Sequence, residues 1–204
     1  MNNYKDSPVF VRKFIDETIS KEGEYSDHKN DLGGKTKFGI IESVARSNGY
    51  EGEMKDLPLS LAQDIYANEY YFKPNFHIIS EESHLIAREM FDTGVNCGTR
   101  VPVKFLQRIL NVFNNQGKYY EDLSVDGLLG RKTAHAYHKL CQIRGEDEVE
   151  TVVYNTLNSM QTVHYIELSE KREKNESFTW GWISNRVDYL NLSLIHISEP
   201  TRPY

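Results

Sequence analysis

The sequence has little of what would hold a protein to a membrane or to a nucleic acid. No apolar run approaches the length of a membrane span, and the amino-terminal residues lack the apolar core of a signal peptide. The formal net charge of -6 at pH 7 argues against binding to nucleic acid or anionic lipid through bulk charge. We therefore expect a protein that is made in the cytoplasm, with no membrane insertion and no nucleic-acid partner.

Cysteines and cofactor motifs are also scarce. Only Cys97 and Cys141 occur in 204 residues, and two cysteines so far apart make no disulfide framework, so we expect two thiols. No phosphate-binding loop or dinucleotide motif is present. His135, His138 and Cys141 recur every third residue, but three ligands without a fourth fit a zinc site poorly. We expect solvated histidines, a buried thiol, no metal and no cofactor.

What is present favours a packed, mostly α protein. Hydrophobic residues make up 39% of the chain and aromatic residues 12%, which is enough for a core. Long alternation of apolar and polar residues is missing, so we expect at most a small hairpin between Tyr25 and Ile40. Helices are predicted from Pro8 to Glu22, from Ile40 to Ser47, from a capping box at Ser60–Gln63 to Phe72, from a Ser80 cap to Cys97, from Pro102 onward, and from Glu146 to Glu176.

Glu22 stands out at the end of the first predicted helix. Gly23 suits the position just past a helix end, so Glu22 falls in the last turn, where the helix dipole disfavours a carboxylate. An acid in that place, beside Tyr25, is a candidate for a raised pKa and for proton donation. The alternative is a solvated glutamate at a fraying helix end.

The residues around Glu22 form a longer motif. Glu22-Gly-x-Tyr25 is followed by Asp31-x-Gly-Gly-x-Thr36-x-x-Gly-Ile40. This order resembles the amino-terminal signature of the phage and bacterial muramidases of glycoside hydrolase family 108. In that family the motif glutamate is the catalytic acid, and the matching position here is Glu22. Glu24 stands where the family usually has glycine, which adds a carboxylate next to the proposed acid.

The resemblance implies hydrolysis of the bond between N-acetylmuramic acid and N-acetylglucosamine in peptidoglycan. That reaction needs a protonated acid and a second group at the oxocarbenium-like centre: a carboxylate, a base-activated water or the substrate's acetamido group. Asp31 is the best second carboxylate by its place in the motif, with Asp27 and Glu24 as rivals. A purely structural role of Asp31 in the loop is an equal alternative. Thr36 is either a hydrogen-bonding neighbour of the acid or a β-branched strand residue.

Three tyrosines are candidates for substrate binding. Tyr25, Tyr70 and Tyr71 offer flat apolar rings with a hydroxyl, which suit sugar rings. For Tyr70 and Tyr71 the helical placement favours a core role at least as strongly.

The second half of the chain carries a different pattern. The pairs Leu106-Gln107 and Asp126-Gly127, with Gly130 and Thr133, look like the LQ…DG…G…T pattern of peptidoglycan-binding helical modules. An ordinary loop between two helices is the alternative. The run from Trp180 to Val187 resembles the closing Gly-Trp-x-x-Arg-Val motif of such modules.

These observations predict a lysozyme-like muramidase domain over residues 1–97 and a helical peptidoglycan-binding module over residues 98–190. The run from Leu192 to Arg202 looks like a translated sequencing adapter, so we expect residues 191–204 to be a non-native tail. The expected function is that of a phage endolysin, a monomer that needs a holin or another export route to reach the cell wall. The alternative is a non-catalytic wall-binding or secretion-assisting protein whose site Glu24 has impaired.

Overall fold

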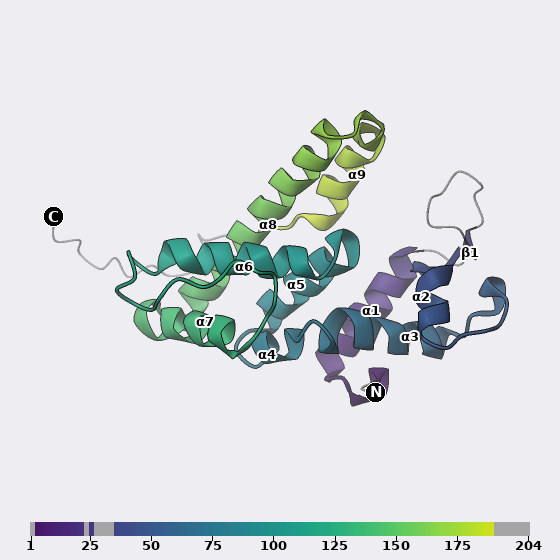
Figure 1. The fold of residues 1–204 in the computed structure, drawn as a ribbon, viewed down its shortest axis with the longest axis horizontal. Coiled ribbons are helices and arrows are strands. Elements are labelled where there is room, and N and C mark those ends of the chain that lie inside the picture. The colour runs from purple at the N-terminus through teal and green to yellow at the C-terminus, as the bar shows by residue number, and fades with distance from the viewer. Residues whose placement is uncertain (1–2, 23–24, 27–34, 190–204) are drawn as a thin grey trace. The chain divides into compact units, whose positions relative to one another are not determined.

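The chain forms two compact units, residues 1–100 and residues 101–204 (Figure 1). The structure is a computed structural model that describes residues 3–22, 25–26 and 35–189. Both units are built mainly from helices, which confirms the mostly α class. None of the helices in these described ranges is long and apolar enough to cross a membrane.

The first unit packs its helices around one apolar core. Its helical elements are η1 (Tyr4–Asp6), α1 (Val9–Glu22), α2 (Glu42–Ser47), η2 (Met54–Asp56), α3 (Leu59–Ala67), the π-helical turn η3 (Asn68–Phe72), α4 (Phe76–Ser80) and α5 (His84–Cys97). α1 contacts both α3 and α5, and α4 contacts α5. Ile15 of α1, Ile65 of α3 and Ile86 of α5 are at most 1% exposed. Burial of these side chains from three helices fixes α1 within the unit.

The predicted capping box at Ser60 is wrong. α3 begins at Leu59, and the carbonyl of Pro58 accepts the first helical hydrogen bonds, with no side-chain cap. Gln63, the other half of the predicted box, instead donates from Nε2 to Asp16 Oδ1 of α1 at 2.8 Å. A contact between two helices therefore replaces the local cap.

The predicted cap at Ser80 is also wrong. Ser83 caps α5, and its hydroxyl accepts a hydrogen bond from the Ile86 amide at 3.0 Å. Ser80 ends α4, a short helix that the sequence did not predict, and its Oγ lies 2.6 Å from the Tyr71 hydroxyl. The Ser80 hydroxyl is engaged by Tyr71 and by the His77 carbonyl, and Ser83 starts the helix instead.

A small antiparallel sheet follows α1. Its strands are β1 (Tyr25–Ser26), β2 (Thr36–Lys37) and β3 (Ile40–Ile41), in the order β1-β2-β3. The β2–β3 turn is Phe38-Gly39, and both residues have positive φ, 55° and 74°. Two such residues in a two-residue loop are typical of a type I′ hairpin turn. The small hairpin expected in this region is thus part of a three-stranded sheet.

The second unit is a group of longer helices. They are α6 (Arg100–Phe113), α7 (Arg131–Arg144), α8 (Glu146–Glu170), η4 (Glu173–Asn175) and α9 (Glu176–Arg186). The single helix predicted over 146–176 is wrong, because α8 ends at Glu170 and the chain turns back. Asn175 stabilises this turn by donating from Nδ2 to the Leu168 carbonyl at 2.9 Å. As a result α9 packs along α8 (Figure 1).

Candidate active site and peptidoglycan module

Glu22 is the last residue of α1. Ile15 and Ile19, which come earlier in the same helix, are buried in the core of the unit. Side chains from other elements hold α1 in place, since Asp16 accepts hydrogen bonds from the Tyr4 hydroxyl at 2.7 Å and from Gln63 at 2.8 Å. The proposed acid is therefore carried by a packed helix rather than by a loop.

The sheet brings Tyr25 and Thr36 onto adjacent strands. Tyr25 pairs with Lys37, and Thr36 pairs with Ser26 on one side and with Ile41 on the other. Tyr25 is 44% exposed, and Thr36 is half-buried. Two residues separate Glu22 from Tyr25 in the sequence. This part of the unit combines an acid position, an accessible aromatic ring and a hydroxyl.

The other candidate carboxylates are not placed. Asp31 and its rivals Glu24 and Asp27 lie outside the described residues. Their roles stay predictions.

Tyr66 is a further residue of this region that the sequence did not identify. Its ring is 1% exposed, and its hydroxyl donates to the Phe38 carbonyl at 3.0 Å, which ties the β2–β3 turn to α3. The turn was hard to recognise in the sequence, because Phe-Gly is not one of the Asn-Gly or Asp-Gly pairs typical of such turns. Tyr66 thus helps to set the position of the hairpin that carries Thr36.

Tyr70 and Tyr71 differ in environment. Tyr70 is half-buried, and its ring centroid lies 5.4 Å from that of Tyr66. Tyr71 is 2% exposed and shares a hydrogen bond with Ser80. Burial raises the pKa of Tyr71, and the charge of Glu81 adds to the effect. The structure places Tyr71 in the core, the alternative role left open for it, whereas Tyr70 keeps partial access to solvent.

In the second unit, Gln107 contacts the Asp-Gly turn directly. Its Nε2 donates to Asp126 Oδ1 at 2.9 Å and to the Leu128 carbonyl at 3.2 Å, and its Oε1 accepts from the Gly127 amide at 2.9 Å. Asp126 Oδ1 also accepts from the Leu128 amide at 2.8 Å, and Gly127 has a φ of 73°. These contacts show what the LQ…DG residues do in the fold: a buried glutamine holds the turn between α6 and α7.

The tryptophans of the closing motif lie on α9. Trp182 stacks against Phe178, with centroids 6.1 Å apart, and lies 5.4 Å from the ring of Tyr165 on α8. Trp180 is 84% exposed, and Phe178 is 59% exposed. A Cβ at Gly181 would meet only Asn185 Nδ2 at 3.8 Å, so packing does not require glycine there. α9 thus presents exposed aromatic rings beside a glycine that the fold does not explain.

Comparison with known proteins identifies both units. Residues 15–98 match the family model described as Glycosyl hydrolase 108, and residues 101–187 match the one described as Predicted Peptidoglycan domain. Residues 15–98 therefore form a glycosyl hydrolase 108 domain. The protein is a glycoside hydrolase, and a peptidoglycan-domain module follows its catalytic domain.

A solved structure shares the fold of this glycoside hydrolase. The structure of Brucella abortus SagA aligns with a TM-score of 0.62 at 23% sequence identity, over 86% of this chain and 87% of that chain. No curated protein sequence matches the chain. The structural likeness therefore supports the fold, and the family matches support the activity.

The hydrogen bond of Tyr66 gives a first prediction for this hydrolase. Tyr66→Phe keeps the buried ring but leaves the Phe38 carbonyl without its donor, so we expect a loss of about 1 kcal/mol in the free energy of unfolding. If the turn positions the site, the lost restraint lowers kcat about five- to tenfold with little change in KM, because misplaced groups act on the chemical step. Steady-state release of reducing ends from soluble glycan separates the two constants.

Tyr50→Phe is the matched control. Its hydroxyl also donates to a backbone carbonyl, that of Glu53, at 2.8 Å, but on an exposed surface. We expect it to keep kcat. Equal kcat values for both variants would contradict a positioning role of Tyr66.

Proposed function

We propose that this glycoside hydrolase is an N-acetylmuramidase, which cleaves the β-1,4 bond between N-acetylmuramic acid and N-acetylglucosamine, with Glu22 as its general acid. One observation carries the proposal. Glu22 ends a packed helix, and the next described elements along the chain are two adjacent strands that bear an accessible tyrosine and a half-buried threonine. An acid at the end of a packed helix, with an aromatic residue three positions later in the sequence, suits protonation of a glycosidic oxygen in a bound sugar chain.

Each proposed site residue has a separate task. Glu22 donates its proton to the leaving oxygen. Asp31 supplies the second carboxylate, which stabilises the oxocarbenium-like centre or activates water. Thr36 hydrogen-bonds near the acid, and Tyr25 and Tyr70 contact the sugar rings, because aromatic rings combine an apolar face with a polar hydroxyl.

Mass spectrometry of digested peptidoglycan tests the reaction. Purified sacculi treated with the full chain should yield fragments with reducing N-acetylmuramic acid ends. Anhydro ends would instead identify a lytic transglycosylase. Unchanged glycan would favour the non-catalytic wall-binding or secretion-assisting alternative.

We further propose that the second unit holds peptidoglycan through the exposed rings of α9. Trp180 presents most of its surface to solvent, although large apolar side chains are usually covered in a folded domain. Tryptophan ranks high among residues that carry binding energy, and its ring suits the apolar face of a sugar. Gly181 next to it leaves room for a ligand to approach the helix.

Trp180→Ala should weaken retention on the wall. In a Glu22→Gln background, which prevents digestion, we expect the apparent affinity for purified sacculi to fall about fivefold, the effect of losing roughly 1 kcal/mol of aromatic contact. The thermal midpoint should stay the same, because Trp180 is exposed. Cosedimentation at several protein concentrations measures the affinity.

Val163→Ala serves as the control for this experiment. Val163 is 53% exposed on α8 and does not belong to the exposed rings of α9. If Trp180→Ala sediments like Val163→Ala and like the parent, α9 is not the binding surface.

The biological setting is a separate part of the proposal. We propose that the protein acts as a monomeric phage endolysin, made in the host cytoplasm and released to the wall through a holin. Genome neighbourhood tests this role: an adjacent holin gene supports lysis, and an adjacent secretion or toxin cluster supports a role in protein export.

A further inference from the structure

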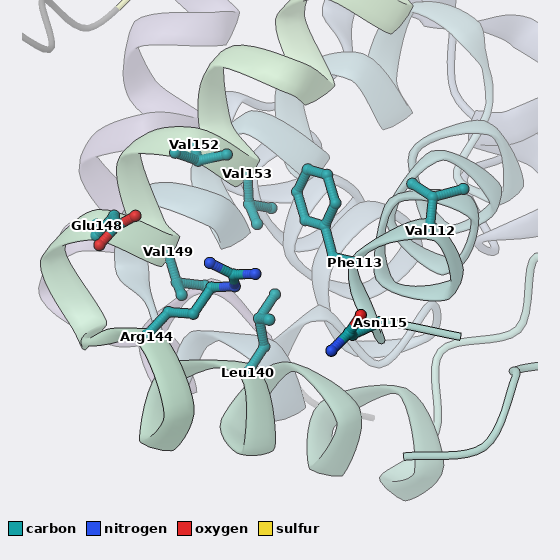
Figure 2. Close-up of a pocket in the computed structure, with 9 residues that line it drawn as sticks. All are labelled: Val112, Phe113, Asn115, Leu140, Arg144, Glu148, Val149, Val152 and Val153. Carbon is teal, nitrogen blue, oxygen red and sulfur yellow. The ribbon is translucent and has the colours of Figure 1, made fainter. Parts of the chain in front are cut away.

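The second unit contains a cavity that the proposed function does not use. Its volume is about 340 Å³, and it lies between the end of α6, the end of α7 and the first turns of α8 (Figure 2). The residues that line it are Val112, Phe113, Asn115, Leu140, Arg144, Glu148, Val149, Val152 and Val153. This volume is at the small end of the range for ligand pockets, about 300–1,000 Å³, so it suits one end of a molecule rather than a polymer.

The floor of the cavity is apolar and rigid. Leu140, Val149 and Val153 are at most 2% exposed, so their positions are fixed by the core. Val112 at the rim is 76% exposed, so it leaves an apolar side chain accessible at the entrance of the cavity. Short aliphatic groups fit such a floor because they gain apolar contact without needing polar partners.

The rim supplies one cation. Arg144 is the last residue of α7, and Figure 2 shows its guanidinium extending toward the valines of α8. The guanidinium lies 5.9 Å from the ring centroid of Tyr119 and is within salt-bridge distance of no carboxylate in the described part of the chain. The helix dipole favours a positive charge at the end of α7, which explains a cation at this position. It does not explain why the guanidinium faces a cavity. A guanidinium with unused donors favours a carboxylate ligand.

The other polar groups at the rim restrict the choice of ligand. Asn115 offers an amide, and Glu148 adds a carboxylate four residues after Arg144. In a peptide, the amide N–H groups next to the terminal carboxylate could donate hydrogen bonds to the side-chain oxygens of Asn115 and Glu148. A disaccharide carries many hydroxyls, and three polar side chains cannot satisfy them in a pocket of valines. The lining therefore favours a short peptide end over the glycan.

We propose that this cavity binds the carboxyl-terminal D-alanine end of the peptide stems of peptidoglycan, an inference that rests on the proposed wall-degrading function. The terminal carboxylate accepts hydrogen bonds from Arg144, and the methyl groups lie against Val149 and Val153. The module would then contact the peptide here and the glycan at Trp180, two separate parts of one polymer.

Binding of a labelled stem peptide to the full chain tests the inference. The probe is L-Ala-D-Glu-L-Lys-D-Ala-D-Ala with fluorescein at its amino terminus, titrated by fluorescence anisotropy with the Glu22→Gln protein. The same peptide with an amidated carboxyl terminus should bind about ten- to a hundredfold more weakly, because a charge-assisted bidentate contact is lost. This comparison changes only the ligand, so it does not depend on the folding of a variant.

The protein side of the test is Arg144→Gln, with Arg172→Gln as the control. Arg172 is exposed just after α8 and lies outside the lining of the cavity. Arg144→Gln should lower the affinity for the free-acid peptide by the same factor as amidation does, and it should leave the affinity for the amidated peptide unchanged. Arg172→Gln should bind both peptides like the parent. Equal binding of acid and amide, or an unchanged affinity in Arg144→Gln, would overturn the proposal.

Activity is measured in parallel on the full chain with Glu22 intact, and the peptide titration is repeated on that protein. If reducing N-acetylmuramic acid ends appear while the pentapeptide does not bind, the cavity assignment fails and the muramidase proposal stands. If the peptide binds with the expected dependence on Arg144 and no reducing ends appear, the muramidase proposal fails and the cavity assignment stands.

Discussion

Glu22→Gln is expected to lower turnover of peptidoglycan at least about 100-fold, the lower bound of what a general acid contributes. Glutamine is nearly isosteric with glutamate and keeps its hydrogen-bonding capacity, but it cannot donate a proton to the leaving oxygen. The release of reducing ends from purified sacculi measures the loss. Because the amide preserves shape, binding to sacculi should be retained while the chemical step is lost.

The stability of this variant separates a catalytic role from a structural one. Glu22 is at the C-terminal end of α1, where the helix dipole is negative. Removing a carboxylate from this position should leave the free energy of unfolding unchanged or raise it by about 0.3–1 kcal/mol. A thermal melt of the full chain tests this, and a clear drop in the midpoint would point to a structural glutamate.

Glu24→Gln is the matched control, the same substitution two residues away. Glu24 is outside the described residues and stands where the family usually has glycine, so we expect it to keep most activity. Removing its charge should shift the pH optimum downward, because a neighbouring carboxylate raises the pKa of the acid. Loss of turnover in Glu24→Gln with retention in Glu22→Gln would name Glu24 as the acid. Full activity in both would remove the muramidase proposal.

Helix periodicity predicted much of this structure because it depends on local spacing. The first helix, from Val9 to Glu22, was expected from a serine-proline start and a glycine just past its end. The mostly α class followed from the lack of alternating patterns. Both features are set by residues within a few positions of each other, and a single sequence contains that information.

Helix starts were predicted less well, because tertiary contacts compete with local caps. Ser80 has the capping residue type but spends its hydroxyl on Tyr71, and Ser83 caps the helix instead. Gln63 likewise contacts Asp16 across two helices. The spacing of residues in sequence cannot show which partner a polar side chain takes.

The site shows the same division. The motif resemblance identified Glu22, Tyr25 and Thr36. The structure places Glu22 at the end of α1, Tyr25 on β1 and Thr36 on the adjacent strand β2. Tyr66 was missed, since its importance comes from one hydrogen bond to a backbone carbonyl in a turn 28 residues away. Strands of two residues are too short to show an alternation of apolar and polar residues. The sheet that positions Thr36 could therefore not be predicted from the sequence pattern.

The largest effect on stability is expected from Gln107→Ala in the second unit. Gln107 is 2% exposed and makes three hydrogen bonds to the turn at Asp126 and Gly127. Alanine removes all three and leaves the buried Gly127 amide without its acceptor. Together these losses should lower the free energy of unfolding of this unit by about 2–4 kcal/mol.

Tryptophan fluorescence reports on this unit alone. The chain has two tryptophans, Trp180 and Trp182, and both lie on α9. A urea titration followed at this signal should show the midpoint of Gln107→Ala falling with an unchanged slope. Gln142→Ala is the control, because Gln142 is exposed on α7 and contacts only side chains of its own helix among the hydrogen bonds that the structure gives for it. Surface substitutions of this kind usually change stability by less than about 0.5 kcal/mol.

The same variant decides what the LQ…DG residues are for. If they only hold the turn, Gln107→Ala should keep its affinity for sacculi at temperatures where the second unit is fully folded. Retained stability with lost affinity would instead make Gln107 part of the ligand site. The buried position of Gln107 and its bonds to backbone groups of the turn favour the first outcome, because a side chain already satisfied by three protein partners has little capacity left for a ligand.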